Sequence, residues 1–404
     1  MCRRSCQATV GGDDKMTTGP AEGSAGDRMH TLRKLLAASL VALFSTGTAY
    51  AQQGVSADTI ALGHSGALSG PLSELNKEYL AGATLYFDQI NARGGVHGRK
   101  VELITLDDAY DPDRTAENVR KLIEKDQVLA LFGCFGTGPS LKAIPIAIAA
   151  KVPFFAPYTG ADAVRKPVNP LVFHIRASYS QEVEKMIDHL ANIGVKSIAV
   201  VHHTDPFGQA GLDAASAALT RRGLPAPIVA PIASDGSNAA ETVRKVIAGN
   251  PAAVILVTAG NSSPAFMRAL LDTDYRPMLY GLSVISSKQL IRELGEKAHG
   301  LVIAQVVPSP FRVDYPFVRE YRQAADKAGL SYSYTALEGY LAARSFGEAL
   351  RRSGRDLTRE RLVDALEGLG DWDAGGLRLA FGPRRRAGMD FVDLTVISKG
   401  NFTR

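Results

Sequence analysis

The sequence predicts an α/β protein made of two lobes, each built on a doubly wound parallel sheet. Two observations carry this prediction: short β-rich runs alternate with amphipathic helical stretches, and two such series follow each other along the chain. Strands separated by helices of this length favour right-handed βαβ units, whose parallel sheets are covered by helices on both faces. The 404 residues, 46% of them apolar, also suit more than one domain.

The first series opens with the segment TIALGHSG, which reads as a strand running into a turn. Residues 74–92 form the first predicted helix, because their apolar positions recur at helical spacing. These positions are Leu75, Tyr79, Ala83, Phe87 and Ile90. Gly94 and Gly95 end this helix, and the segment KVELITLDD is the second predicted strand.

An N-cap residue and a proline predict the start of the next helix. Asp111 supplies an N-cap and Pro112 suits the first helical position, so we expect a helix that runs to about Lys125. The segment VLALFG is the third predicted strand. The glycine-rich loop GCFGTGPS, residues 133–140, then leads into the third helix.

The second series repeats the same units. Its predicted strands are SIAVVHHTD, PIVAPIA, AAVILVTAG and PMLYGLS, and its predicted helices lie near residues 180–193, 207–222, 238–248, 262–273 and 286–294. After the segment GLVIAQVVPSP the chain becomes mainly helical, from about residue 315 to residue 367. Two β-like stretches follow near residues 376–381 and 390–398.

The N-terminal residues carry an export signal. Arg33 and Lys34 form a positive n-region, residues 35–44 a short apolar h-region, and the segment AYA a small-x-small cleavage pattern that ends at Ala51. About ten apolar residues are fewer than the ~20 that a membrane-spanning helix needs. We therefore expect a Sec-type signal peptide at residues 29–51, cleaved after Ala51, and a periplasmic location.

A signal peptide normally begins its chain, so we expect translation to start at Met29 and residues 1–28 to be a non-native extension. Cleavage also removes Cys2 and Cys6 and leaves Cys134 without a partner for an internal disulfide. The expected role of Cys134 is that of a small buried apolar residue.

The glycine-rich loop favours an anionic group without matching a cofactor motif. Neither Gly63, Gly66 and Gly70 nor the loop glycines have the G-x-G-x-x-G spacing of a dinucleotide site, and no Walker lysine follows. Backbone N–H groups at a helix N-terminus still favour a negative group, and Thr137 and Ser140 add hydroxyl donors. A ligand carboxylate fits this loop as well as a phosphate.

Other candidate chemistry is weak. The acidic segment DDAYDPD lacks the glycine and terminal Glu of a calcium loop, and His202 and His203 end a strand without a motif partner. The run Arg384 to Arg386 reads as a solvated face. Basic and acidic residues are interspersed, with a net charge of +5 and no basic block, so we expect no nucleic-acid partner. No cofactor, metal or catalysis is expected.

Several segments in a fixed order resemble the type I periplasmic solute-binding proteins of ABC importers, the family that includes the leucine/isoleucine/valine-binding proteins. The longest is GALSGPLSELNKEYLAGATLYFDQINARGGVHGRKVELITLDDAYDPDRTAENVRKLI. The others are ALFGCFGTGPS, VPFFAPYTGADAVR, TDPFGQAGLDA and ALEGYLAARSFGEAL. The likeness runs from about residue 55 to residue 400.

This resemblance implies two Rossmann-like lobes that are joined by three crossings, with a ligand held in the cleft between them. It places residues 55–174 and 308–382 in lobe 1, and residues 178–305 and 387–402 in lobe 2. The family's members are monomeric receptors without a cofactor, so the resemblance also implies a small-molecule ligand and a permease partner in the inner membrane.

The resemblance implies site residues by position. In the family, a hydroxyl after the third strand and the turn after the fourth strand hold an amino acid's carboxylate, and here these positions are Thr137 with Tyr158, Thr159 and Gly160. A tyrosine of the second lobe closes over the ligand, and the matching residue is Phe207. Each of these residues is expected to bind ligand.

The chain departs from the family pattern at further positions. An acidic residue of the second lobe normally meets the ligand ammonium, but the segment LYGLSVIS places Ser283 there, which puts an α-amino acid ligand in doubt. The early disulfide of some members is also missing, because Tyr110 and Gly136 occupy its two positions.

The sequence thus predicts a periplasmic receptor that captures a small polar solute, of the amino-acid or related carboxylate type, by lobe closure and delivers it to a permease. Two alternatives stay open. One is a periplasmic sensor that hands the closed state to a signalling receptor, and the other is an enzyme on a Rossmann-like fold.

Overall fold

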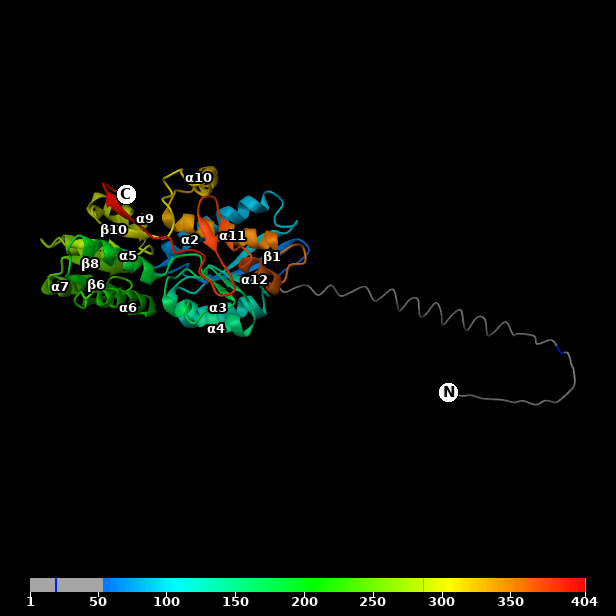
Figure 1. Cartoon of the computed structure of the whole chain (residues 1–404), viewed down its shortest axis with the longest axis horizontal. Coiled ribbons are helices and arrows are strands. Elements are labelled where there is room, and N and C mark those ends of the chain that lie inside the picture. Colours follow the sequence, from blue (N-terminus) through cyan, green and yellow to red (C-terminus); the bar gives the residue numbers. More distant parts are fainter. Residues whose placement is uncertain (1–18, 20–53, 286, 404) are drawn as a thin grey trace, which may run out of the picture. The chain divides into compact units, whose positions relative to one another are not determined.

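The computed structural model describes residue 19, residues 54–285 and residues 287–403. The predicted signal peptide lies outside the described residues, as does the predicted extension apart from residue 19. From residue 54 on, the chain folds into two lobes, each built on its own sheet (Figure 1). No helix among the described residues is long and apolar enough to cross a membrane.

Lobe 1 contains a parallel sheet with the strand order β2-β1-β3-β4-β5. The strands are β1 (Thr59–Gly66), β2 (Lys100–Asp107), β3 (Ala130–Phe132), β4 (Phe154–Phe155) and β5 (Val172–Phe173). Neighbouring residues face opposite sides, as the twofold repeat of a strand requires. Leu131 and Phe154 belong to one core cluster, and Phe132 and Phe155 to the other.

Helices cover both faces of this sheet. They are α2 (Ser73–Asn91), α3 (Pro112–Glu124), α4 (Thr137–Ala149), α10 (Pro316–Ala328), α11 (Tyr334–Arg352) and α12 (Arg359–Glu367), with a short 3₁₀ turn η1 (Asp162–Val164). On one face, α2 and α11 touch backbone to backbone, because a Cβ on Gly82 would lie 1.7 Å from the carbonyl oxygen of Ala336. On the other face, α3 and α4 pack around Leu131.

The helix starts follow the sequence prediction. The carboxylate of Asp111 accepts from the N–H of Asp113 at 2.8 Å, and Pro112 is the first residue of α3.

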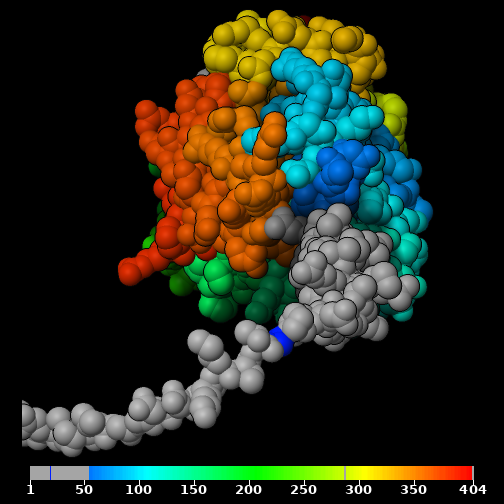
Figure 2. All heavy atoms as spheres, turned by 90° about the vertical axis from the view of Figure 1, so that its right-hand side faces the viewer, coloured from blue at the N-terminus to red at the C-terminus, as the bar shows by residue number. Residues whose placement is uncertain are grey.

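Phe132 packs edge-on against Phe346 of α11 at 5.7 Å between ring centres. Helices from the end of the chain therefore complete the core of lobe 1. Figure 2 shows this part in orange against the blue and cyan residues at the start of lobe 1.

Lobe 2 has a mixed sheet with the order β14-β13-β10-β9-β8-β6-β7. The strands are β6 (Ile198–His203), β7 (Ile228–Ile232), β8 (Ala253–Val257), β9 (Met278–Gly281), β10 (Val302–Gln305), β13 (Asp393–Ser398) and β14 (Asn401–Thr403). The strands β6 to β10 are parallel, as predicted, but β13 and β14 are antiparallel. The two-residue turn of Lys399 and Gly400, both with positive φ, forms this hairpin.

The helices of lobe 2 also divide between two faces. They are α5 (Tyr179–Asn192), α6 (Pro206–Arg221), α7 (Ala239–Gly249), α8 (Ser262–Leu271) and α9 (Ser287–Leu294), followed by the 3₁₀ turn η2 (Gly295–Ala298). Apolar residues of α5 and α6 share a core with Val200 and Ile255, while those of α7, α8 and α9 share one with Val201 and Leu256.

The described chain passes between the lobes three times. The crossings lie between β5 and α5, between β10 and α10, and between β12 (Arg378–Ala380) and β13; β12 pairs with β11 (Asp371–Asp373) in a small hairpin of lobe 1. The first and third crossings are hydrogen-bonded to each other. The N–H of His174 donates to the carbonyl of Arg386 at 2.7 Å, and the N–H of Gly388 donates to that of His174 at 2.7 Å.

Arg386 differs from its predicted place on a solvated face. Its side chain is buried, its guanidinium lies 4.5 Å from the ring centre of Phe173, and its Nε donates to the carbonyl of Pro170 at 3.0 Å. Arg384 and Arg385 are exposed as predicted. A charge run cannot reveal from composition that its last residue anchors the third crossing to lobe 1.

Candidate ligand-binding site

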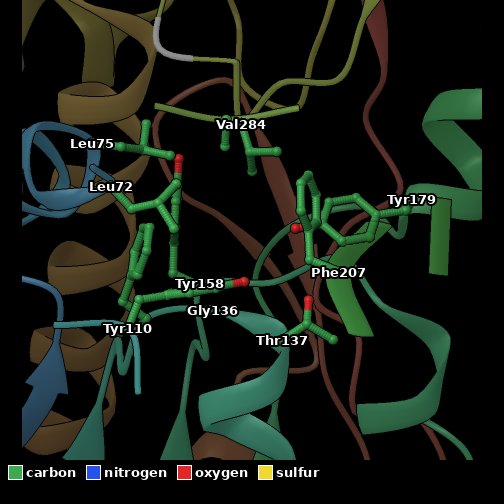
Figure 3. Close-up of a pocket in the computed structure, with 11 residues that line it drawn as sticks. Leu72, Leu75, Tyr110, Gly136, Thr137, Tyr158, Tyr179, Phe207 and Val284 are labelled. Atoms are coloured by element: carbon green, nitrogen blue, oxygen red, sulfur yellow. The ribbon is translucent and has the colours of Figure 1, made fainter. Parts of the chain in front are cut away.

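A small cavity lies between the lobes, beyond the carboxyl ends of the strands, and we call it the interlobe cavity. Its lining residues are Leu72, Leu75, Tyr110, Phe135, Gly136, Thr137, Tyr158, Tyr179, Phe207, Ala259 and Val284. Open α/β sheets bind ligands in such crevices. Figure 3 shows Leu72, Leu75 and Tyr158 on one side, Tyr179 and Phe207 on the other, and Val284 opposite Thr137.

The glycine-rich loop forms the floor of the cavity. Gly136 has φ 98°, and a Cβ there would lie 2.3 Å from Cε2 of Tyr110, so glycine allows both the turn and the close approach of that ring. Helix α4 begins at Thr137 without a side-chain cap. Its first turn is therefore a favourable place for a negative ligand group.

The hydroxyl of Thr137 is positioned for ligand binding. Its Oγ1 lies 2.7 Å from Oγ1 of Thr159, which also accepts from the N–H of Ala161 at 3.2 Å. When the Thr159 hydroxyl donates to Thr137, the Thr137 proton is available to a ligand acceptor. Figure 3 shows the Thr137 oxygen directed toward the cavity.

The loops after β3 and β4 are joined by hydrogen bonds. The N–H of Tyr158 donates to the carbonyl of Cys134 at 2.9 Å, and the N–H of Gly136 donates to that of Tyr158 at 3.2 Å. The ring of Tyr158 stacks on Phe135, with 5.5 Å between ring centres and 17° between planes. The segment PYTGA is thereby held against the glycine-rich loop.

Gly160 supports the cavity wall from behind. A Cβ on Gly160 would lie 2.5 Å from Cδ1 of Tyr179, and the carbonyl of Gly160 accepts from the N–H of Tyr179 at 2.7 Å. Tyr179 is the first residue of α5, which starts with a capping box of Ser178 and Gln181. The start of α5 is therefore fixed at the point where lobe 1 passes into lobe 2.

Lobe 2 contributes apolar groups. Phe207 lies in the first turn of α6, where Asp205 caps the helix by accepting from the N–H of Gly208 at 2.9 Å. Its ring lies 5.5 Å from that of Tyr179 at an angle of 68°. Val284 and Ala259 complete this side.

A buried ionic group, the Arg176 cluster, lies behind the wall formed by Tyr158 and Tyr179. It comprises Arg176 on the first crossing, Glu182 of α5, Ser283 and Glu338 of α11, all of them buried. The guanidinium of Arg176 lies 5.0 Å from the ring centre of Tyr158 and 5.7 Å from that of Tyr179. The cluster connects both lobes to the crossing.

Each charge of the cluster has a partner. Arg176 Nη2 lies 3.3 Å from Oε1 of Glu182, and Arg176 Nε lies 3.5 Å from Oε1 of Glu338. Glu182 accepts from the N–H of Ser283 at 2.7 Å and from its hydroxyl at 3.0 Å. The hydroxyl of Ser283 also contacts the guanidinium of Arg176. Ser283 is thus occupied within the cluster.

The electrostatics of the cluster follow from burial. Burial raises the pKa of Glu338 to about 7, an effect that Arg176 opposes and Glu182 adds to. Burial acts to lower the pKa of Arg176, but the carboxylates of Glu338 and Glu182 outweigh it and raise that pKa. Arg176 is therefore charged at every physiological pH.

The lobes also touch around the cavity. A Cβ on Gly260 of lobe 2 would lie 2.3 Å from the carbonyl oxygen of Pro71, and Arg292 of α9 donates to Glu74 of α2 at 2.9 Å. Gly138 of α4 faces Pro206 of α6, because a Cβ added to Gly138 would lie 3.8 Å from Cγ of Pro206. The lobes are therefore closed on each other.

A sequence model of the periplasmic binding protein family matches residues 59–401, which is most of the chain. The chain belongs to this family. Its members bind small molecules and are not enzymes, which confirms the prediction that this chain is a binding protein without catalytic activity. The type I fold predicted from the resemblance is also confirmed.

Similar known proteins support the assignment to the periplasmic binding protein family. An amino acid binding protein from Pseudomonas aeruginosa is 26% identical over 166 residues, which cover 41% of this chain and 44% of that protein. The match thus spans less than half of that curated relative. A possible leucine/isoleucine/valine-binding protein from Rhodopirellula baltica has 32% identity and a TM-score of 0.82, covering 86% of this chain and 96% of that one.

A third protein shares the fold at lower identity. It is a branched chain amino acid ABC transporter protein from Thermus thermophilus with bound valine, with 20% identity and a TM-score of 0.78. The likeness covers 86% of this chain and 96% of that one. At this identity the likeness supports the two-lobed fold alone.

The structure separates the predicted site residues into three groups. Thr137, Tyr158 and Phe207 line the interlobe cavity. Thr159 and Gly160 lie directly behind it and position Thr137 and Tyr179. Ser283 is turned toward Arg176 and Glu182. That these six residues bind ligand stays a prediction.

Sequence reasoning missed much of the lining. Leu72, Leu75 and Val284 look like ordinary core residues, because a lining position and a core position have the same apolar character. Tyr110 was noted as one of two positions without a cysteine, and its ring against Gly136 explains what fills that space. Tyr179 could have been found from its place just after the capping residue Ser178 at the first crossing.

The remaining candidate groups have structural roles. Burial raises the pKa of Cys134 to about 12, so its thiol stays protonated and is a poor nucleophile. His203 Nε2 lies 2.7 Å from Oγ of Ser262. Asp108 accepts from the hydroxyls of Ser65 and Thr115 at 2.8 and 2.9 Å. Within the described ranges, no three potential metal ligands gather.

Proposed function

We propose that the protein is the solute receptor of an ABC importer and that it binds an amino acid or a related small carboxylate of the branched-chain type in the interlobe cavity. The observation that carries the proposal is the lining of the cavity by both lobes. Thr137 and the uncapped start of α4 suit a carboxylate, while Leu72, Phe207 and Val284 suit an apolar body.

The lining also supports capture by lobe closure. A ligand that contacts Thr137 of lobe 1 and Phe207 of lobe 2 has more contacts in the closed state than in an open one. A ligand shifts a two-state equilibrium by its difference in affinity for the two states. Binding therefore favours the closed state.

Closure gives the membrane permease a signal that the receptor is loaded. The proposal places the mature receptor, a monomer, in the periplasm after export by the signal peptide at residues 29–51. The names of two similar proteins support the solute class: the relative from Pseudomonas aeruginosa is called an amino acid binding protein, and that from Rhodopirellula baltica is called a possible leucine/isoleucine/valine-binding protein.

The deciding experiment identifies the solute. Native mass spectrometry of the protein as purified, followed by a thermal-shift screen of amino acids, amides and short carboxylates, is expected to give one chemical class of hits. A bound ligand at a hundredfold excess over its Kd stabilises the folded state by about 2.7 kcal/mol. If no solute of these classes raises the melting temperature, the proposal fails.

A transport experiment tests the importer role separately. Cells that lack the gene are expected to lose uptake of the radiolabelled solute found in the screen. A strain complemented with the wild-type gene is expected to regain it. Unchanged uptake in the deletion strain would contradict the importer role and leave solute binding intact.

A further inference from the structure

The interlobe cavity has four side-chain hydroxyls and no ionised side chain among its described lining residues. The hydroxyls belong to Thr137, Tyr110, Tyr158 and Tyr179. Burial raises the pKa of each tyrosine, so all three remain protonated and able to donate. A zwitterionic amino acid would bring both a carboxylate and an ammonium into this space.

Three acids around the cavity are already engaged, and burial raises the pKa of a fourth, Glu78 of α2, which lies near Tyr158. Glu182 accepts two hydrogen bonds from Ser283 and pairs with Arg176, and Glu338 pairs with Arg176 from the other side. Asp205 caps α6. Each of these carboxylates would have to abandon a partner to meet a ligand ammonium, and a buried cation without a counter-charge is strongly disfavoured.

The surroundings of the cavity instead favour a negative ligand. Arg165 donates to the carbonyls of Thr159 and Arg176 at 3.3 and 3.1 Å, directly behind the segment PYTGA. Arg176 is the second guanidinium behind this wall. Two cations thus lie behind this wall, beside the acids Glu182, Glu338 and Asp162.

Burial also weakens the negative charge of Glu338, because it raises the pKa of that carboxyl to about 7. The guanidinium groups of Arg165 and Arg176 behind this wall thus add to the positive end of α4 beside Thr137.

We propose that the cavity selects a small monocarboxylate with a branched or aromatic apolar body and without an ammonium group, such as a 2-oxo acid or an unsubstituted acid. This inference rests on the proposed function and narrows its solute class. The carboxylate lies at Thr137 and the start of α4. The apolar body lies among Leu72, Phe207 and Val284, where an ammonium would be unpaired.

The test compares matched ligands on the same protein. The mature wild-type protein is unfolded and refolded to remove any bound solute, and is then titrated calorimetrically with leucine, 4-methyl-2-oxopentanoate and 4-methylpentanoate. Phenylalanine and phenylpyruvate form a second pair. We expect the acids without an ammonium to bind at least tenfold more tightly than the amino acid of the same shape.

The neutral amide 4-methylpentanamide is the control for charge. It is expected to bind at least tenfold more weakly than 4-methylpentanoate, and equal affinities would overturn the assignment of a carboxylate. Leucine binding as tightly as its 2-oxo analogue would overturn the exclusion of the ammonium while leaving the proposed receptor function standing. If the protein binds neither the leucine series nor the phenylalanine series but another solute, the monocarboxylate assignment is overturned and the proposed receptor function still stands.

A variant tests the missing acid directly. Val284→Glu adds a carboxylate to the lobe 2 wall, and Val284→Gln is the matched neutral control. We expect the ratio of leucine affinity to 2-oxo acid affinity to rise at least tenfold in Val284→Glu and to stay unchanged in Val284→Gln. An equal change in both would contradict the proposal. If Val284→Glu does not fold, the wild-type ligand series decides alone.

Discussion

Arg176 Nε lies 3.5 Å from Oε1 of Glu338, which joins the first crossing to a helix that comes more than 150 residues later in the chain. The same guanidinium pairs with Glu182 at the start of lobe 2. One buried side chain therefore forms ion pairs with both lobes at the point where they meet.

Replacing Arg176 is expected to destabilise the fold strongly. Arg176→Met removes the ion-pair partner of Glu182 and Glu338, and breaking a buried ion pair costs about 3–5 kcal/mol of unfolding free energy. Urea unfolding monitored by circular dichroism measures this. The double variant Arg176→Met with Glu182→Gln is the control, since it removes one of the stranded charges and is expected to recover part of the loss. A loss below about 1 kcal/mol in the single variant, the size of a surface ion pair, would contradict this account.

Glu338 is expected to make stability depend on pH. Its folded pKa of about 7 is above its ordinary value of 4.5, chiefly because it is buried. The folded state therefore holds the proton more tightly, so this group's contribution is fully present below pH 4.5 and is lost as pH rises through 7. Between pH 5 and pH 8 the wild type should lose on the order of 2 kcal/mol relative to Glu338→Gln. Parallel stability curves for the two proteins would rule the effect out.

Thr137 is expected to matter for binding more than for stability. Thr137→Ala removes a hydroxyl directed at the cavity, and a hydrogen bond to a charged group contributes roughly 1.5–3 kcal/mol, about a ten- to hundredfold change in Kd. Thr137→Ser keeps the hydroxyl and serves as the matched control. Calorimetry with the solute identified from the purified protein measures Kd, and the melting temperature without solute should change little. Equal affinity in the alanine and serine variants would remove Thr137 from the site.

Gly138 is expected to control closure. A Cβ on Gly138 would lie 3.3 Å from Cγ of Pro112 in the same lobe and 3.8 Å from Cγ of Pro206 on the other lobe. Alanine therefore requires a small shift of Pro112, while the longer side chain of Gly138→Leu also strikes Pro206 in the closed state. Gly138→Leu should bind solute at least tenfold more weakly than Gly138→Ala, which shares the contact with Pro112 and is the matched control. Small-angle X-ray scattering should show that solute no longer makes the leucine variant more compact. Normal compaction would contradict the proposed clash.

The sequence was sufficient for the order of the helices and of most strands, because these depend on local information, but the short strands β4, β5, β11 and β14 were not predicted. Asp111 and Pro112 mark the start of α3, and apolar spacing marks the buried face of α2. The antiparallel hairpin of β13 and β14 was not predicted, because strand direction depends on how the third crossing returns to lobe 2. The spacing of apolar residues along the chain does not determine the path of that crossing.

Two of the candidate site residues could be placed at the cavity from the sequence. Thr137 belongs to the glycine-rich loop and Tyr158 was placed by the family resemblance, and both line the interlobe cavity. The Arg176 cluster could not be predicted, since Ser283 meets Glu182 across a separation of 101 residues and no local pattern records such a contact. The orientation of Ser283 away from the cavity depends on that same long-range hydrogen bond.

The paired hydrogen bonds between His174 and the third crossing restrict how the lobes can move. With the N–H of His174 bound to Arg386 and its carbonyl bound to Gly388, these two connections bend together as one ribbon. Two separate tethers would permit twisting as well as bending, whereas one ribbon leaves mainly rotation about a single axis. Under the proposed capture by lobe closure, this single axis would return Phe207 to the same place above Thr137 each time the lobes close.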